Sequence, residues 1–119
     1  MSTAEVANQL VAFCKGNKYL EAVETLYAED IVSVEATEHG GSREMRGKQA
    51  VKGKNEWWFQ AYEVHSASVT GPFVSPERFA VLYSFDSTRK DTGERTVFNE
   101  VAVYTVENGK IIREEFLYA

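Results

Sequence analysis

Six residues between positions 25 and 47 have a carboxyl or imidazole side chain, which is a dense set for so short a stretch. They are Glu29, Asp30, Glu35, Glu38, His39 and Glu44. Carboxylates and imidazoles are the groups that most often act as general acids and bases. We interpret His39, in a glycine-rich segment, as a candidate ligand contact at a pocket rim. The alternative is a solvated loop.

Glu35 lies within "IVSVEA", a short run of alternating β-branched residues. Side chains alternate between the two faces of a strand. If Val32, Val34 and Ala36 face the interior, Glu35 faces water or a partner subunit. A β-bulge near this point could instead turn Glu35 inward, and we therefore keep it as a candidate ligand contact.

Glu100 is the better internal candidate for proton transfer, because it lies in the apolar, strand-like segment "RTVFNEVAVYTV". If Ala102 and Tyr104 face a cavity, Glu100 faces it too, and Tyr104 contacts the ligand. If the other face is inward, Asn99 takes that place. Desolvation raises the pKa of a carboxyl in such surroundings toward neutrality. The alternative is a structural hydrogen bond or a cross-strand ion pair.

His65 is the second candidate catalytic residue. It opens a predicted strand in "YEVHSAS", where an imidazole could shuttle protons. The alternative is a half-buried histidine with a satisfied hydrogen bond. The tryptophans in "NEWWFQAY" are distinctive, because three consecutive aromatic residues cannot all face one side of a helix. We interpret Trp57 or Trp58 as a wall for a flat ligand, with core packing as the alternative.

Other kinds of chemistry lack their sequence signals. The histidines and the single cysteine show no metal-site spacing, and there is no phosphate-binding glycine loop. We therefore expect no metal and no cofactor. The net charge is −5 without a basic run, which argues against nucleic acid. No run approaches the length of a membrane span, and the N-terminal residues do not resemble a signal peptide. A lone cysteine suits the cytoplasm.

These residues must be positioned by a single domain, because 119 residues suit one core. Apolar residues at helical spacing predict a first helix that is capped by Ser2 or Thr3 and ended by "KGN", and further helices near 19–28 and 48–61. Alternating and β-branched runs predict strands near 31–36, 62–71, 77–87, 94–106 and 110–118, and "TEHGGSRE" predicts a loop. The order indicates an α+β fold, with three N-terminal helices packed in the concave face of a curled, mostly antiparallel sheet.

The order of elements and three local strings resemble the NTF2-like superfamily, and within it the SnoaL-like and ketosteroid-isomerase-like proteins. The strings are "YLEAVETLYAEDIVSVEA", "RGKQAV" and "VAVYTVENGKIIREEFLY". The likeness covers residues 1–119 and implies a cone-shaped α+β roll, also called cystatin-like. It also implies a homodimer packed through the sheet. Apolar residues on both faces of segment 101–106 are consistent with that dimer.

The functional positions of ketosteroid isomerases are not matched. The aspartate base of these enzymes falls on Ala36, the tyrosine oxyanion donor near Leu10 or Val11, and the protonated aspartate near Val101 or Ala102. None of these side chains can donate or accept a proton, so isomerisation by that mechanism is not expected. We expect an apolar cavity that has few ionisable side chains and binds a small apolar organic ligand. Cofactor-free acid–base chemistry and ligand or protein binding without catalysis both stay open.

Overall fold

The computed structural model describes residues 1–39 and 42–118, and the side chains of residues 38 and 39 also lie outside the description. Within these residues the chain forms three helices and six strands. Their order is α1 (Thr3–Lys15), α2 (Tyr19–Leu26), β1 (Tyr27–His39), β2 (Ser42–Arg46), α3 (Lys48–Ala61), β3 (Tyr62–Val74), β4 (Arg78–Arg89), β5 (Arg95–Glu107) and β6 (Lys110–Leu117).

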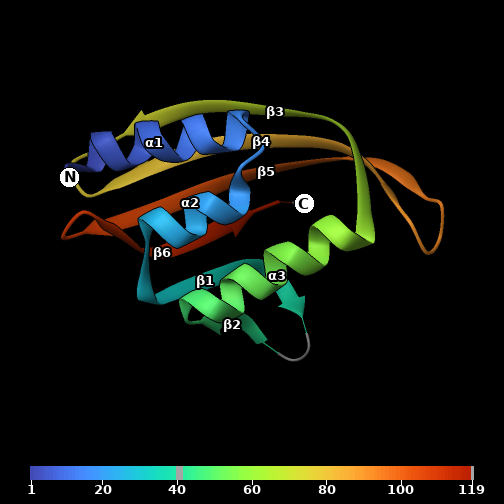
Figure 1. The fold of residues 1–119 in the computed structure, drawn as a ribbon, viewed down its shortest axis with the longest axis horizontal. Coiled ribbons are helices and arrows are strands. Elements are labelled where there is room, and N and C mark those ends of the chain that lie inside the picture. Colours follow the sequence, from blue (N-terminus) through green and yellow to red (C-terminus); the bar gives the residue numbers. More distant parts are fainter. Residues whose placement is uncertain (40–41, 119) are drawn as a thin grey trace.

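All six strands join one curled sheet in the order β2-β1-β6-β5-β4-β3. In this sheet β1 runs parallel to β6, and the remaining neighbours pair antiparallel. The three helices lie on one side of it, with α1 beside β3 and α3 beside β1 and β2 (Figure 1). The predicted α+β fold is confirmed. The sheet does not close, because β2 and β3 remain as its edges.

Local sequence signals explain most of the boundaries. The Ser2 side chain accepts a hydrogen bond from the Glu5 backbone N–H, and Glu5 accepts one from the Ser2 N–H, which together form the capping box that starts α1. The predicted range of α3 is confirmed, while α2 ends two residues early because β1 begins at Tyr27. The predicted loop over 37–44 was wrong in part, because β1 continues to His39 and β2 begins at Ser42.

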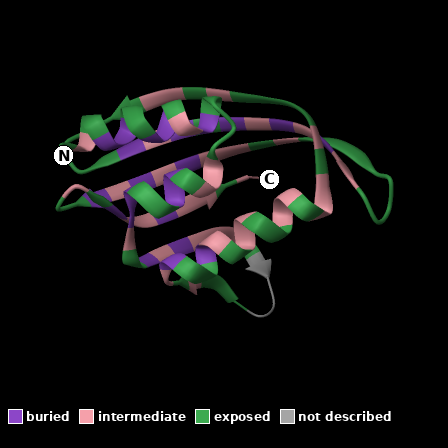
Figure 2. Ribbon diagram, viewed as in Figure 1, coloured by how far each residue is buried: buried purple, intermediate pink, exposed green. Residues whose placement is uncertain are grey.

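The core lies between the helices and the concave face of the sheet. In β4, alternate residues from Phe79 to Ser87 are buried, and they face the buried side of α1. Figure 2 shows buried residues gathered along the sides of α1 and α2 that face the strands. The interior is therefore fixed on this side by packing, and the functional question concerns its polar part nearer α3 and β1.

Candidate functional site

The concave face of β5 is the face that bears Glu100. Ala102, Tyr104 and Val106 are buried on this face, and Glu100 follows the same alternation. In register, Glu100 lies opposite Tyr83 of β4, whose side chain is also buried. The strand-face question raised by the sequence is thus answered in favour of Glu100, which is half-buried and directed toward the interior.

Glu35 also faces the interior, which is the orientation that the sequence left open beside an outward one. Ile31 and Ser33, on the same face of β1, are both 0% exposed, whereas Val32 and Val34 are half-buried on the other face. Side chains of β1 do alternate between the two faces, but Ser33 and Glu35 face inward in place of Val32 and Val34. Ser33 lies next to Glu114 of the parallel strand β6, and this polar pair holds the interior face of β1.

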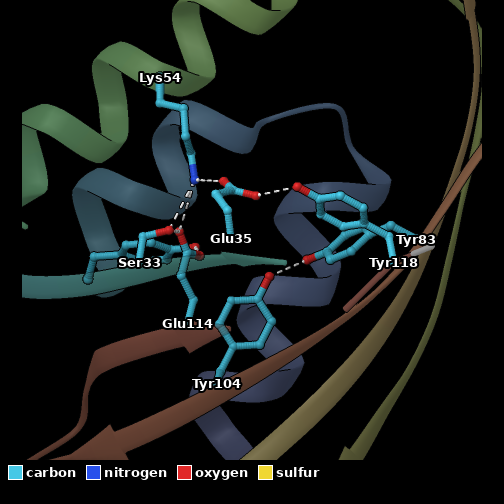
Figure 3. Close-up of polar contacts among 8 residues, drawn as sticks. Ser33, Glu35, Lys54, Tyr83, Tyr104, Glu114 and Tyr118 are labelled. Carbon is cyan, nitrogen blue, oxygen red and sulfur yellow. Dashed lines mark hydrogen bonds and ion pairs between the residues drawn. The ribbon is translucent and has the colours of Figure 1, made fainter. Parts of the chain in front are cut away.

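Lys54 of α3 joins these side chains into one cluster (Figure 3). Its Nζ atom lies 2.7 Å from Glu35 Oε1 and donates to Ser33 Oγ at 3.0 Å. The same ammonium lies 3.9 Å from Glu114 Oε1 and 4.9 Å from the centre of the Phe116 ring. The second oxygen of Glu35 accepts a hydrogen bond from the Tyr118 hydroxyl at 3.2 Å. We call Glu35, Lys54, Glu100 and Glu114 the carboxylate cluster.

Glu114 is the most deeply buried member of the cluster, with 2% of its surface exposed. It accepts hydrogen bonds from the Tyr27 hydroxyl and from Ser33 Oγ. Burial raises the pKa of Glu114, while Lys54 and the two hydroxyl donors oppose that rise. Both carboxylate oxygens of Glu114 have a hydrogen-bond partner, so Glu114 serves to hold Ser33 and Lys54 in place.

Glu100 differs from the other two carboxylates because no described residue donates a hydrogen bond to it or forms an ion pair with it within 4.0 Å. Burial raises the pKa of Glu100 to about 8, and the negative charges of Glu35 and Glu114 add to the rise while Lys54 opposes it. Lys54 is paired with Glu35 and Glu114, so it only partly offsets the rise in the pKa of Glu100.

A second polar string crosses the core beside the cluster. The hydroxyl groups of Tyr83 and Tyr104 lie 2.8 Å apart, and Cys14 Sγ lies 3.6 Å from the Tyr83 hydroxyl. Burial raises the pKa of both tyrosines well above the ordinary value and that of the Cys14 thiol to about 11. These three groups therefore stay neutral, and a thiolate nucleophile at Cys14 is not supported.

Comparison with known proteins gives the family. The model of the SnoaL-like domain matches residues 1–118. The chain belongs to the SnoaL-like family. A Mesorhizobium loti protein provisionally named a SnoaL-like polyketide cyclase is 42% identical, with a TM-score of 0.94, and the match covers 99% of this chain and all of that one.

Two more distant structures share the fold of this SnoaL-like protein. A Xanthomonas campestris protein with a cystatin-like fold is 16% identical with a TM-score of 0.78, and the match covers 100% of this chain and 92% of that one. A Catenulispora acidiphila protein with a ketosteroid isomerase-like fold, in complex with trimethylamine, is 17% identical with a TM-score of 0.73; coverage is 99% and 88%. No curated protein compared with the chain matches it.

The structure separates His65 from Glu100. In the SnoaL-like chain, Val64 pairs with Ser87 and Ser66 pairs with Asp86, so His65 is an extra residue in a bulge of β3. Its Nε2 atom lies 2.7 Å from Thr88 Oγ1, on the convex face of the sheet. Strand alternation cannot reveal such a bulge. The two candidate catalytic residues therefore lie on opposite faces and cannot act on one bound molecule.

The predicted ligand contacts also divide between the faces. Asn99 pairs with Ser84 and is exposed on the convex face, whereas Tyr104 is buried in the core. Trp57 is 55% exposed on α3. Trp58 is half-buried and stacks on Tyr62, with ring centres 4.9 Å apart. The His39 side chain lies outside the described residues.

Two members of the carboxylate cluster, Lys54 and Glu114, were missed from the sequence. Lys54 lies three residues after buried Val51 and four before Trp58, so helical spacing could have placed it on the inner face of α3. The expectation of few ionisable groups in the interior was wrong, because Lys54 and Glu114 lie there. No local pattern predicted that Glu114 faces the interior, because a bulge in β6 shifts the pairing of this strand with β5.

Half-buried aromatic residues border the cluster on its open side. Phe98 contacts Tyr118 with ring centres 5.0 Å apart, and Trp58 contacts Phe85 at 5.2 Å. The side chains of Lys54 and Glu35 keep 21% and 19% of their surface exposed. Solvent therefore contacts these two groups, and the aromatic residues offer apolar contact area beside them.

The structure of this SnoaL-like chain has two hollows, of which the smaller includes Glu100 in its lining and the larger shares no residue with the carboxylate cluster. One, of about 290 Å³, lies on the convex face over Leu82, Val101 and Leu117. The other, of about 640 Å³, lies between α1, α3 and β3. Among the described residues, no three histidine, cysteine or acidic side chains are placed to hold a metal ion. In the same residues no helix has both the length and the apolarity needed to cross a bilayer.

Proposed function

We propose that this SnoaL-like protein is a cofactor-free acid–base enzyme acting on a small, mostly apolar organic molecule, with Glu100 as the proton-transfer group. The observation that supports it is the state of Glu100: an inward, half-buried carboxyl without a paired cation among the described residues, whose pKa is raised to about 8. A carboxyl group with such a pKa can donate a proton at neutral pH and accept one slightly above it.

The surrounding side chains suit proton transfer next to a carbonyl group. Glu100 in its ionised form would take a proton from the carbon beside the carbonyl, and the carboxylic acid so formed would return it at another atom. Lys54, held by Glu35 at 2.7 Å, places positive charge close to the developing oxyanion. Tyr118 and Trp58 would hold the apolar part of the substrate.

Isomerisation, cyclisation and dehydration of a carbonyl-containing substrate use this kind of step, whereas in hydrolysis the ionised carboxyl group would instead take a proton from the attacking water. The 42% identical Mesorhizobium loti protein, provisionally named a polyketide cyclase, favours cyclisation of a poly-carbonyl compound among them. In that reaction a carbanion next to one carbonyl attacks another carbonyl, and the acid form of Glu100 would protonate the new alkoxide. No oxidant, reductant or metal is needed for this balance.

The experiment measures exchange of α-protons for deuterium in an aryl ketone, 2-tetralone, by NMR. Wild-type protein should accelerate exchange, and Glu100→Gln should lower the acceleration by about 100-fold or more, which is typical of a lost general base. Glu107→Gln, which changes an exposed carboxyl at the end of the same strand, is the matched control. Equal rates for wild type and Glu100→Gln would contradict the proposal.

A non-catalytic ligand-binding or protein-interaction domain is the alternative. The observation in its favour is that Glu35, Lys54 and Glu114 satisfy one another, as a purely structural network would. A binding domain would retain its affinity for the ketone when Glu100 becomes glutamine, and the wild-type protein would not accelerate exchange. The same experiment therefore separates the two functions.

We also propose a homodimer formed through the convex face of the sheet. Leu82 and Leu117 are 40% and 57% exposed there, and Val101 lies between them. Exposed apolar side chains grouped on one face are typical of an interface. Leu82→Lys should shift the mass measured by analytical ultracentrifugation from dimer to monomer. A wild-type protein that sediments as a monomer at high concentration would contradict the proposal.

A further inference from the structure

The hollow of about 640 Å³ lies apart from the carboxylate cluster, and we call it the edge hollow. It is lined by the last turn of α1, the connection to the start of α2, the end of α3, and Tyr62 and residues 64–69 of β3. In Figure 1, β3 starts at the end of α3 and then runs beside α1. The volume is within the range of about 300–1,000 Å³ that small-molecule sites occupy.

Ala67 is the reason that this part of the concave face is open. It pairs with Phe85, whose side chain is buried, so Ala67 faces the same concave side. Its own surface is nevertheless exposed, because neither α1 nor α3 covers it. Since β3 is an edge strand, the hollow opens to solvent along that edge. A methyl group at position 67 leaves depth that a larger side chain would fill.

The walls of the edge hollow are aromatic. Tyr19, Phe59 and Tyr62 line it, and the rings of Tyr19 and Phe59 have centres 5.1 Å apart. Trp58 supports the wall from behind, because it contacts Phe59 edge-on at 5.1 Å and stacks on Tyr62 at 4.9 Å. Rings held in this way offer a flat contact surface at little cost in conformational entropy, which suits a planar apolar ligand.

The charge of the lining is opposite to that of the whole molecule. The chain has 18 acidic residues and a net charge of −5, yet none of the twelve lining residues is acidic. Lys15 is the formally charged residue among them, and the imidazole of His65, which also borders the hollow, lies beside Thr88 on the convex face. The Arg89 guanidinium lies 5.9 Å from the centre of the Tyr62 ring, but it is paired with Asp91 at 2.7 Å, so Lys15 is the cation that an anionic ligand would meet. This charge pattern favours an anionic group on the ligand.

We propose that the edge hollow is a binding site for a flat aromatic carboxylate, with the ring on Ala67 between the aromatic walls and the carboxylate directed toward Lys15. This site differs in charge from the carboxylate cluster and does not depend on the proposed chemistry of Glu100. A protein that failed every test of proton transfer could still bind such an acid here.

The test compares two probes of the same shape, 2-naphthoate and its neutral analogue 2-naphthamide. Binding to the full chain is measured by isothermal titration calorimetry and by ¹⁵N chemical-shift mapping. We expect 2-naphthoate to bind more tightly, with shifts at residues 14–19 and 62–69. Lys15→Gln should weaken 2-naphthoate about three-fold, the usual effect of an exposed ion pair, and leave 2-naphthamide unchanged.

Ala67→Trp should fill the edge hollow and weaken both probes at least ten-fold, and Ala67→Leu should act in the same direction. Gln60→Trp is the matched control, because Gln60 is exposed on α3 and is not among the lining residues. Circular dichroism verifies that each variant folds. Absence of 2-naphthoate binding, equal affinity for both probes, or binding unchanged in Ala67→Leu would overturn the proposal. Shifts confined to residues around Glu100 would do the same.

Discussion

Replacement of Glu100 by glutamine should change how the stability of the protein depends on pH. The pKa of Glu100 is about 8 in the folded protein, against an ordinary value of 4.5. Between these two values the folded chain holds a proton on Glu100 that the unfolded chain has released. The free energy of unfolding therefore falls as the pH rises through this interval, and it stops falling above about pH 8. Glutamine is neutral at every pH and removes this contribution.

The size of the effect follows from the width of the interval. Each pH unit is worth about 1.4 kcal/mol, so the whole interval would correspond to about 5 kcal/mol. Because Glu100 is half-buried, solvent screens part of its cost, and we expect about half of that value. Wild type and Glu100→Gln should thus be nearly equal at pH 5, and the variant should be more stable by about 2–3 kcal/mol at pH 9.

Urea unfolding at pH steps from 5 to 9 measures the difference, with the slope against urea concentration as a check that both proteins unfold alike. Glu114, whose pKa is also raised, contributes a trend of the same sign, but it is present in both proteins and cancels. Glu107→Gln provides the control for loss of an exposed carboxyl group. A difference between wild type and Glu100→Gln that stays constant from pH 5 to 9 would refute the reasoning.

Three further changes test the packing around the cluster, each by urea unfolding at pH 7. Lys54→Met should cost about 3 kcal/mol, because it leaves two buried or half-buried carboxylates without their cation; Lys52→Met, at an exposed pair, should cost less than about 1 kcal/mol, and equal losses would argue against a structural role for the cluster. Tyr104→Phe should cost about 1 kcal/mol, since the Tyr83 hydroxyl loses its partner at 2.8 Å. Phe79→Ala should cost about 3–5 kcal/mol, because the ring is 2% exposed; a loss below 1 kcal/mol would mean that the core there is not closely packed.

The predictions made from the sequence succeeded where a local pattern and its tertiary environment agree. Helical spacing and the Ser2 cap located α1, and α3 has the predicted bounds. The predicted ranges of the last four strands lie close to their observed limits. The short strand β2 was missed because "SREMR" is polar, and its five residues become a strand by pairing with β1. Pairing of this kind depends on a partner that no local pattern reveals.

The faces of the strands were harder to predict. Apolarity favoured Val32 and Val34 as the inner residues of β1, yet Ser33 and Glu35 face inward because Lys54 and Glu114 meet them there. A buried charge network reverses the phase that hydrophobic alternation alone would choose. The strand-face question at Glu100 could be posed from the sequence, and the burial of Ala102 and Tyr104 answered it.

By itself, the sequence determined the α+β order of elements, the family resemblance and the choice of Glu100 as a candidate for proton transfer. It could do so because propensity, periodicity and capping act over a few residues. The tertiary structure alone decided which titratable groups meet. A bulge at Ile112 places Glu114, not Arg113, opposite Tyr104, and a bulge at His65 puts its imidazole beside Thr88. One extra residue in a strand shifts every later side chain to the other face. The carboxylate cluster therefore results from strand register, which long-range pairing sets.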